Sequence, residues 1–449
     1  MAAAAREVLH NCSNDCPTGL PVVDDELITY LKSLPEDYWD FVEYEKKYTH
    51  FIHTYPAMMI PPIPEAILKI MKRYQPGIKN LLDPFMGSGT VLLEGVLSNV
   101  NVWGVDLNPL ACLLAKAKCT PIDPDLLKAA STTLLEKIGA DMHNDVALEK
   151  PQFQNIDYWF KDYVIRDLQV IKQNIKEIED KDLKALFFVA FSQTVRDCSN
   201  TRNNEFKLYR IPEERLGEFN PSVLDTFRSH LEKCGQGMAE LYERYRGGCN
   251  VTVVAADTRH FSLDEQMDLL ITSPPYGDSR TTVAYGQFSR LSLQWLDLEE
   301  YDYVSSQIDK EKLDKYLLGG MNGGEDHDLP SESLKEALDR IAGVDKKRAA
   351  DVLSFYVDLN KCLANITAHM KVNSYQFWVV GNRTVKKVNL PTDAIISELG
   401  VQYGLKTVAI IPRSISNKRM PSENSPTNEK GKKVPTMTKE HIVVLRKER

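Results

Sequence analysis

The segment Leu81–Glu94, with the sequence LLDPFMGSGTVLLE, limits the fold of this chain more than any other stretch. An apolar run ends at Asp83, a short turn contains Gly87 and Gly89, and an apolar helical pattern follows. This order is typical of a strand, a tight turn and a helix. Two glycines one residue apart let the backbone approach a ligand closely, and the first N–H groups of the helix point toward it. The segment predicts either a ligand site in an α/β core or an ordinary structural unit of such a core.

The glycine turn differs from two common nucleotide-binding motifs. No lysine follows the second glycine, as it does in GxxxxGK[ST], and the third glycine of GxGxxG is missing. Asp106 lies 17 residues after Gly89 and ends the next apolar run, Val102–Val105. An acidic residue at the end of a second strand is suited to bind the hydroxyl pair of a ribose. Asp106 is therefore a candidate ribose ligand.

Length and composition indicate a soluble protein with more than one structural unit. A chain of 449 residues can bury a large core. It contains no run of about 18 apolar residues, the length of a membrane-spanning helix. The first residues become charged at Arg6 and lack the apolar region of a signal peptide, so we expect a cytoplasmic protein with no membrane partner. The eight cysteines are scattered, which favours reduced thiols and predicts no metal site.

The net charge of −8 gives no general indication of a nucleic-acid partner. Residues 371–449, however, carry 15 Lys and Arg against 6 Asp and Glu. This basic C-terminal part is either a solvated surface or a region that meets phosphates.

The pattern along the chain divides it into four regions. Residues 1–45 are a polar, acidic leader, and residues 46–120 contain the glycine turn. Residues 121–248 show a succession of helical patterns, far too long for an ordinary connection between strands. The α/β pattern returns over residues 249–449, with a charged, glycine-rich loop insertion at about 299–350. We expect a helical insertion between the two halves of an α/β domain.

A second motif follows a strand in the last region. The strand Met267–Thr272 runs directly into Ser273-Pro274-Pro275-Tyr276, and the strand before it ends at Asp257. Two prolines cannot continue a strand, so the chain must turn out of the sheet at its carboxyl end. In open parallel sheets, ligands bind at this end. The tetrapeptide is therefore expected to lie near the glycine turn.

Two further segments have two readings each. Phe51–Pro62 is too rich in proline for a helix interior, and it is either a connector or a strip that lies across a ligand at the glycine turn. The polar loop Arg196–Lys207 either contacts a substrate or joins two helices.

Together, DPFMGSGT and TSPPY resemble the motifs of the DNA amino-methyltransferases, which transfer a methyl group from S-adenosylmethionine to an exocyclic base nitrogen. HTYPAMMIPP and MTKEHIVVLRK also look like segments of this family. The resemblance implies a doubly wound, Rossmann-like methyltransferase sheet with a large helical insertion. The serine variant of the tetrapeptide is associated with the cytosine-N4 type. In many serine-type members the tetrapeptide precedes the glycine motif, whereas here Gly87 comes first and Ser273 last.

The resemblance also implies roles for individual residues. Asp83, Phe85, Gly87 and Gly89 would line the donor site, with Asp106 on the ribose, Asp257 near the adenine amine and Tyr55, beside His53 and Pro56, over the methionine end. Asp257 has a second reading as a surface acid that ends a strand. Acceptors at Ser273, Pro274 and Pro275 would bind the hydrogens of the target amine, Tyr276 would stack on a base outside the duplex, and Arg280 and Tyr285 would contact the flipped nucleotide or its phosphates.

The resemblance thus implies a site-specific DNA cytosine-N4 methyltransferase that uses S-adenosylmethionine, flips its target base out of double-stranded DNA and works beside a cognate restriction endonuclease. The alternatives are adenine-N6 methylation, methylation of structured RNA and a non-catalytic DNA-binding subunit. The candidates for reading DNA are the helical block 121–248 and the basic loop Arg413–Lys433. Neither offers a sequence code for the bases that it contacts.

Overall fold

The computed structural model describes residues 20–144, 146, 148–202, 205–278, 281–298, 309–320, 328–415, 423–424, 434–435 and 439–449. Throughout these ranges, no helix combines the length and the apolar character that crossing a membrane requires.

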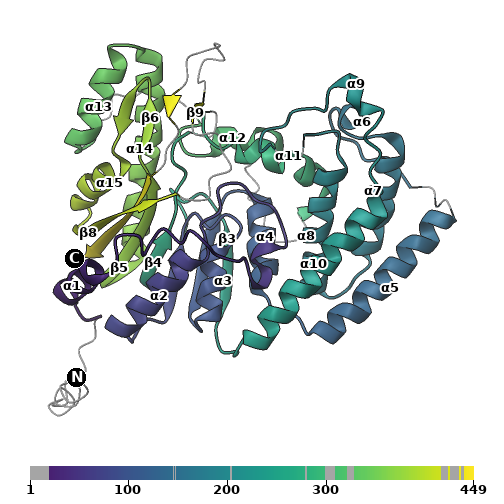
Figure 1. The fold of residues 1–449 in the computed structure, drawn as a ribbon, viewed down its shortest axis with the longest axis horizontal. Coiled ribbons are helices and arrows are strands. Elements are labelled where there is room, and N and C mark those ends of the chain that lie inside the picture. Colours follow the sequence, from purple (N-terminus) through teal and green to yellow (C-terminus); the bar gives the residue numbers. More distant parts are fainter. Residues whose placement is uncertain are drawn as a thin grey trace.

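A seven-stranded sheet forms the centre of the molecule (Figure 1). Its strands are β1 (Asn80–Asp83), β2 (Asn101–Asp106), β3 (Val251–Ala255), β4 (Met267–Thr272), β5 (Met370–Gly381), β8 (Leu405–Ser414) and β11 (Lys439–Lys447). Their spatial order is β3-β2-β1-β4-β5-β11-β8. The strands from β3 to β5 pair in parallel, whereas β11 is antiparallel to β5 and β8. Because the strand order reverses beside β1, the predicted doubly wound α/β fold is confirmed.

Helices cover both faces of the sheet. One face carries α2 (Pro62–Tyr74), α3 (Thr90–Leu97) and α4 (Pro109–Cys119), and the other carries α13 (Glu332–Ala342), α14 (Lys346–His369) and α15 (Thr392–Val401). Successive side chains of a strand point to opposite faces. Leu81 accordingly packs in the core beneath α3 and α4, while Leu82 packs beneath α14 and α15. Burial on both faces explains why β1 and β4 read as short apolar runs without alternation.

The predicted helical insertion is present between β2 and β3. After α4 it comprises α5 (Pro124–His143), α6 (Ile156–Trp159), α7 (Asp162–Lys176), α8 (Lys181–Cys198), α9 (Glu213–Leu216) and α10 (Val223–Arg244). Every α8 residue from Ala185 to Arg196 is buried, because α4, α7, α10 and α11 (Tyr285–Trp295) surround this helix. The block therefore shares a continuous core with one face of the sheet.

The remaining elements are α1 (Asp24–Ser33), η1 (Tyr48–Phe51), η3 (Lys310–Lys312), α12 (Leu313–Tyr316), β6 (Arg383–Val385), β7 (Val388–Leu390), β9 (Glu423–Asn424) and β10 (Val434–Pro435). Three of them, α1, η3 and α12, lie in the leader and in the loop insertion. In the leader, the buried carboxylate of Asp24 accepts hydrogen bonds from Tyr375, Lys406 and Arg446 on three strands, which fixes α1 to the sheet edge. In the insertion at 299–350, the described residues include α12 and α13.

Candidate active site

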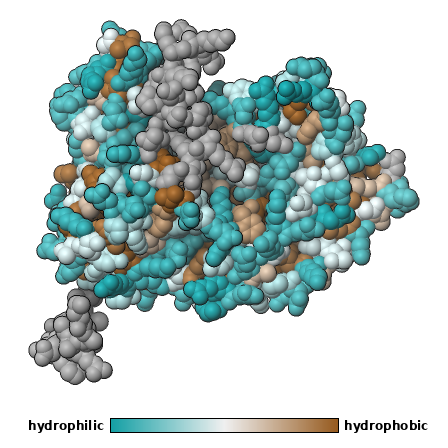
Figure 2. All heavy atoms as spheres, in the orientation of Figure 1, coloured by the Kyte–Doolittle hydropathy of each residue, from teal (hydrophilic) through white to brown (hydrophobic). Residues whose placement is uncertain are grey.

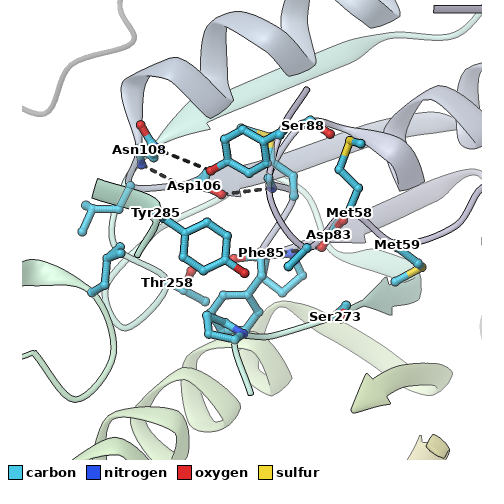
Figure 3. Close-up of a pocket in the computed structure, with 18 of the residues that line it drawn as sticks. Met58, Met59, Asp83, Phe85, Ser88, Asp106, Asn108, Thr258, Ser273 and Tyr285 are labelled. Atoms are coloured by element: carbon cyan, nitrogen blue, oxygen red, sulfur yellow. Dashed lines mark hydrogen bonds between the residues drawn. The ribbon is translucent and has the colours of Figure 1, made fainter. Parts of the chain in front are cut away.

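A cavity lies at the carboxyl ends of β1, β2, β3 and β4 (Figure 3). It is lined by Tyr55–Met59, Asp83–Ser88, Thr90, Val91, Asp106–Asn108, Asp257, Thr258, Ser273, Pro275, Tyr285 and Tyr316–Leu318. The space between these residues, counted out to the solvent at its mouth, is about 890 Å³. We call it the central cavity, and its size and mixed polar and apolar lining suit an organic cofactor.

Most residues selected from the sequence meet at this cavity. Its wall includes Tyr55, Asp83, Phe85, Gly87, Asp106, Asp257, Ser273, Pro275 and Tyr285, whereas Gly89, Pro274 and Tyr276 adjoin the wall, and Arg280 lies outside the described residues. The glycine turn and the tetrapeptide, which are far apart in the chain, therefore face one space. In Figure 3, Asp106 and Ser273 lie on different sides of the pocket.

The glycine turn has the backbone conformation that its sequence predicts. Gly87 and Gly89 adopt φ angles of +47° and +77°, in the left-handed region. A Cβ atom at Gly89 would lie 2.8 Å from Cα of Ala115 in α4, so glycine permits the close packing of two helices. A Cβ atom at Gly87 would approach the ring of Tyr55 to 3.3 Å. The turn is thus shaped by packing on one side and by the cavity on the other.

The carboxylate of Asp106 holds this turn in place. It accepts a hydrogen bond from the N–H of Gly87 at 3.0 Å and another from the N–H of Asn108 at 2.8 Å (Figure 3). Burial raises its pKa to about 6, although these backbone donors oppose the shift. Each carboxylate oxygen has a second lone pair, so Asp106 can still accept hydrogen bonds from a ligand in the cavity.

Asp83 has a structural partner on the neighbouring strand. The hydroxyl of Thr272 in β4 donates to its Oδ1 at 2.7 Å, and the N–H of Phe85 donates to the same atom at 3.1 Å. Burial raises the pKa of Asp83 to about 7. This carboxyl therefore ties the start of the glycine turn to the strand that leads into the tetrapeptide.

Asn108 was not among the residues selected from the sequence, and it organises the aromatic wall. Its Oδ1 caps α4 by accepting from the N–H of Leu110, and its amide donates to the hydroxyl of Tyr55 at 3.1 Å and to Ser289 at 2.7 Å. Tyr285 lies 6.0 Å from Tyr55 between ring centroids. The sequence signal that could have identified Asn108 is the pair Asn108-Pro109, which is typical of a helix start.

Of the residues expected around the ligand, His53 lies outside the cavity wall and Tyr285 lies in it. The buried His53 bonds to Ser192 of α8 at 3.0 Å and is not in the cavity wall, so only Tyr55 and Pro56 of that group lie against the cavity. Tyr285 begins α11 and stands in the cavity wall beside Tyr55, and its expected contact with the flipped nucleotide stays a prediction.

A hydrogen bond to a distant ion pair holds the tetrapeptide. The hydroxyl of Tyr276 donates to Glu440 of β11 at 2.8 Å, and Glu440 pairs with the buried Arg413 of β8. Pro274 is buried, while Ser273 and Pro275 are partly exposed. The ring of Tyr276 is therefore fixed at its outer end.

Asp278 anchors the other side of this loop. Its fully buried carboxylate lies 3.2 Å from the guanidinium of Arg348 in α14 and 3.5 Å from that of Arg383 in β6. These cations and a hydrogen bond from Thr281 hold the pKa of Asp278 below its usual value despite the opposing effect of burial. The guanidinium of Arg383 occupies the place of a side chain at Gly277, where a Cβ atom would lie 1.6 Å from Nη1.

Asp257 lines the cavity but is not a free surface acid. Its two carboxylate oxygens accept hydrogen bonds from the guanidinium of Arg259 at 2.5 to 3.0 Å.

Across the described part of the chain, no cluster of three His, Cys, Asp or Glu residues has the arrangement of a metal site.

Comparison with known proteins identifies the family. No protein-family model matches the chain. The type II methyltransferase M.MvaI of Kocuria varians is 44% identical over 420 residues, which cover 89% of this chain and 91% of that protein. M.MjaII of Methanocaldococcus jannaschii, also a type II methyltransferase, is 36% identical over 91 residues, covering 20% of this chain and 17% of that protein.

Two solved structures of the rRNA methyltransferase aviRa from Streptomyces viridochromogenes cover 88% of both chains at 10% and 11% identity, with TM-scores of 0.30 and 0.29. These scores are too low to add to the fold described above. The identity to M.MvaI extends over nearly the whole of both proteins, and this chain accordingly belongs to the type II methyltransferase family.

Proposed function

We propose that this methyltransferase transfers a methyl group from S-adenosylmethionine to the exocyclic N4 of cytosine in double-stranded DNA, as the modification enzyme of a restriction-modification system. The observation that carries the proposal is that the glycine turn with Asp106 and the tetrapeptide residues Ser273 and Pro275 line one cavity. A donor held by the glycine turn and Asp106 would thereby present its methyl group to an amine held by the tetrapeptide. The type II relatives support DNA as the substrate.

The cavity residues fit the chemical parts of S-adenosylmethionine. Asp106 offers carboxylate lone pairs to the ribose hydroxyls at the end of β2. Phe85 and Tyr55 supply apolar surface, and the partly buried Met58 and Met59 extend it. The absent side chain at Gly87 leaves the backbone open to close approach from the cavity. When bound, the donor supplies a methyl group activated by its sulfonium charge.

The tetrapeptide is suited to bind and orient an exocyclic amine. The lone pair of such an amine is delocalised into the ring, so the nitrogen is a weak nucleophile. The carbonyl groups at Ser273 and Pro274 and the hydroxyl of Ser273 can accept the amine hydrogens and favour a tetrahedral nitrogen. The fixed φ angles of Pro274 and Pro275 keep these acceptors in place before the substrate arrives.

A base must leave the duplex to reach this cavity. Tyr276 provides an aromatic face for stacking on the flipped base, and its bond to Glu440 at 2.8 Å keeps the ring in one orientation. Arg280 remains a proposed contact to the flipped nucleotide. We assign reading of the DNA sequence to the helices α5–α10, over which hydrophilic residues dominate the visible surface in Figure 2. Most of the basic loop Arg413–Lys433 lies outside the described residues.

Nucleoside mass spectrometry tests the proposal directly. DNA would be isolated from a methylation-free host that expresses either the wild-type chain or, as a control, a Ser273→Ala, Tyr276→Ala double variant. We expect N4-methylcytosine in the wild-type DNA and none in the control. N6-methyladenine instead would overturn the assignment of the target base. A chain that binds donor but leaves DNA unmodified would point to RNA as substrate or to a non-catalytic subunit.

A further inference from the structure

We propose that the segment Leu313–Gly320 encloses the adenine of the methyl donor, and that Arg259 is the residue that positions this segment. The inference rests on the function proposed above and names a part of the donor site that lies outside both sequence motifs. Three consecutive residues of the segment, Tyr316, Leu317 and Leu318, line the central cavity.

The strand order indicates which part of the donor these residues meet. Asp106 ends β2, and Ser273 follows β4 on the other side of β1. If the ribose lies at Asp106 and the methyl group faces Ser273, the adenine must extend in the remaining direction, toward the end of β3. Asp257 and Thr258 follow β3 and line the cavity there.

Arg259 connects this end of the cavity to the segment. Its guanidinium holds Asp257 through both carboxylate oxygens, lies 3.0 Å from Oδ2 of Asp358 in α14, and donates from Nη2 to the carbonyl oxygen of Tyr316 at 2.9 Å. The Arg259 side chain is only 14% exposed. A planar guanidinium can bind several acceptors in fixed directions, which an ammonium group cannot do.

Two further contacts fix the ends of the segment. The N–H of Gly319 donates to the same Oδ2 of Asp358 at 2.9 Å. At the other end, the carboxylate of Asp314 accepts from the N–H groups of Gly286 and Gln287 at 2.9 and 3.0 Å. These donors belong to the first turn of α11, which begins with the cavity residue Tyr285. The segment is thus joined to both sides of the cavity that it covers.

The chemistry of this wall fits a flat, largely apolar ring. Leu317 is partly exposed in the wall and Leu318 is 7% exposed, so both present aliphatic surface. Asp257, although bound by Arg259, retains lone pairs that can accept from an amino group on the ring edge. An adenine between these groups would bury its faces against carbon and bond through its amine.

Calorimetric titration of the purified full-length chain with S-adenosylhomocysteine and with 5′-methylthioadenosine tests the inference. Leu317→Ala should weaken both ligands by roughly tenfold, because both carry the adenosine and the variant removes apolar contact area. Arg259→Lys should also weaken both, since the lysine keeps the charge but loses the multiple directed bonds. The matched control is Lys315→Ala, an exposed residue of the same segment that does not line the cavity, and its affinities should be unchanged.

The outcomes separate this inference from the proposed function. Leu317 is partly exposed, so its truncation leaves no void in the core, and thermal unfolding of each variant confirms that it is folded. Wild-type binding together with wild-type affinities in Leu317→Ala and Arg259→Lys overturns the assignment of the adenine wall and leaves the proposed function standing. A wild-type chain that binds neither ligand overturns both.

Discussion

The two motifs at the central cavity are held in place in different ways. The glycine turn is fixed mainly by nearby parts of the chain: Asp106 binds the N–H of Gly87, 19 residues away in sequence, and that of its near neighbour Asn108, while Asp83 at the start of the turn adds one distant bond, to Thr272. The tetrapeptide loop is fixed by distant parts. Tyr276 bonds to Glu440, 164 residues away, and Asp278 pairs with Arg348, 70 residues away.

Because of this difference, donor binding and methyl transfer should depend on different parts of the chain. A site made from two adjacent strands, the turn and the two helices that follow them forms as soon as residues 80–119 pack. A site anchored through β11, β6 and α14 forms only when the whole second half of the domain has folded around it. Changes in the distant anchors should therefore affect transfer more than donor binding, and changes in the turn should affect the packing of its own helices.

The largest expected effect comes from removing the groups that we propose hold the target base. The double variant Ser273→Ala, Tyr276→Ala should lower the rate of methyl transfer by about a thousandfold, a loss typical of removing directed hydrogen-bonding groups from an active site. Donor affinity should change little, because neither side chain ends at the glycine turn. Radiolabelled methyl transfer to DNA and calorimetric donor binding measure the two effects.

An unchanged transfer rate in the double variant would remove the catalytic assignment. An equal loss in donor binding would mean that the glycine turn and the tetrapeptide act as one site. Ser273→Thr keeps a hydroxyl and serves as the conservative control, with partial activity expected.

A somewhat smaller effect is expected at the buried anchor Asp278. Asp278→Ala removes the buried carboxylate that Arg348 and Arg383 share; Arg348 keeps its pair with Asp351, but breaking a buried ion pair in this way still costs about 3 kcal/mol of the free energy of unfolding. Urea unfolding measures the loss. The matched control is Glu65→Ala, which removes the exposed pair with Lys69 and should cost well under about 1 kcal/mol. Equal effects in the two variants would refute the anchoring role.

The contrast also explains how much could be predicted from the sequence. The glycine turn and Asp106 were recognisable because their geometry depends on two consecutive strands and the turn and helix between them. The central strands were recognisable because burial on both faces leaves short apolar runs such as Leu269–Ile271. The helical insertion followed from its length and periodicity. For these features, local pattern and tertiary packing agree.

The remaining features depend on contacts that no local pattern encodes. Nothing near Arg259 in sequence indicates that it meets Asp358 and the carbonyl of Tyr316. The charged, glycine-rich composition around Tyr316–Leu318 predicted a loop, because composition does not show which residues a fold will bring to a cavity. No local pattern in the leader indicates that Asp24 bonds to three partners from the second half of the chain.

A third prediction tests the packing of the glycine turn. Gly89→Ala should lower the free energy of unfolding by about 2 kcal/mol, since a left-handed φ of +77° is costly for alanine and the new Cβ would meet Ala115. The control is Gly139→Ala in the interior of α5, where a Cβ meets nothing within 4 Å and should stabilise the helix by up to about 1 kcal/mol. Thermal and urea unfolding compare the two, and a neutral Gly89→Ala would contradict the close packing.

The smallest expected effect concerns pH and the donor. Burial raises the pKa of Asp106 to about 6, so its carboxyl becomes protonated as the pH falls below this value. A neutral carboxyl is a weaker acceptor for ribose hydroxyls, so the affinity for S-adenosylhomocysteine should fall by about tenfold between pH 7 and pH 5. The Asp106→Asn variant should bind S-adenosylhomocysteine weakly, and its affinity should not depend on pH in this range.

A control variant concerns Asp83, which lies nearby and has a pKa of about 7. This carboxyl bonds to Thr272 and to the N–H of Phe85, so Asp83→Asn should keep the pH dependence of the affinity. If Asp83→Asn abolishes it instead, the ribose contact lies at the end of β1 rather than β2.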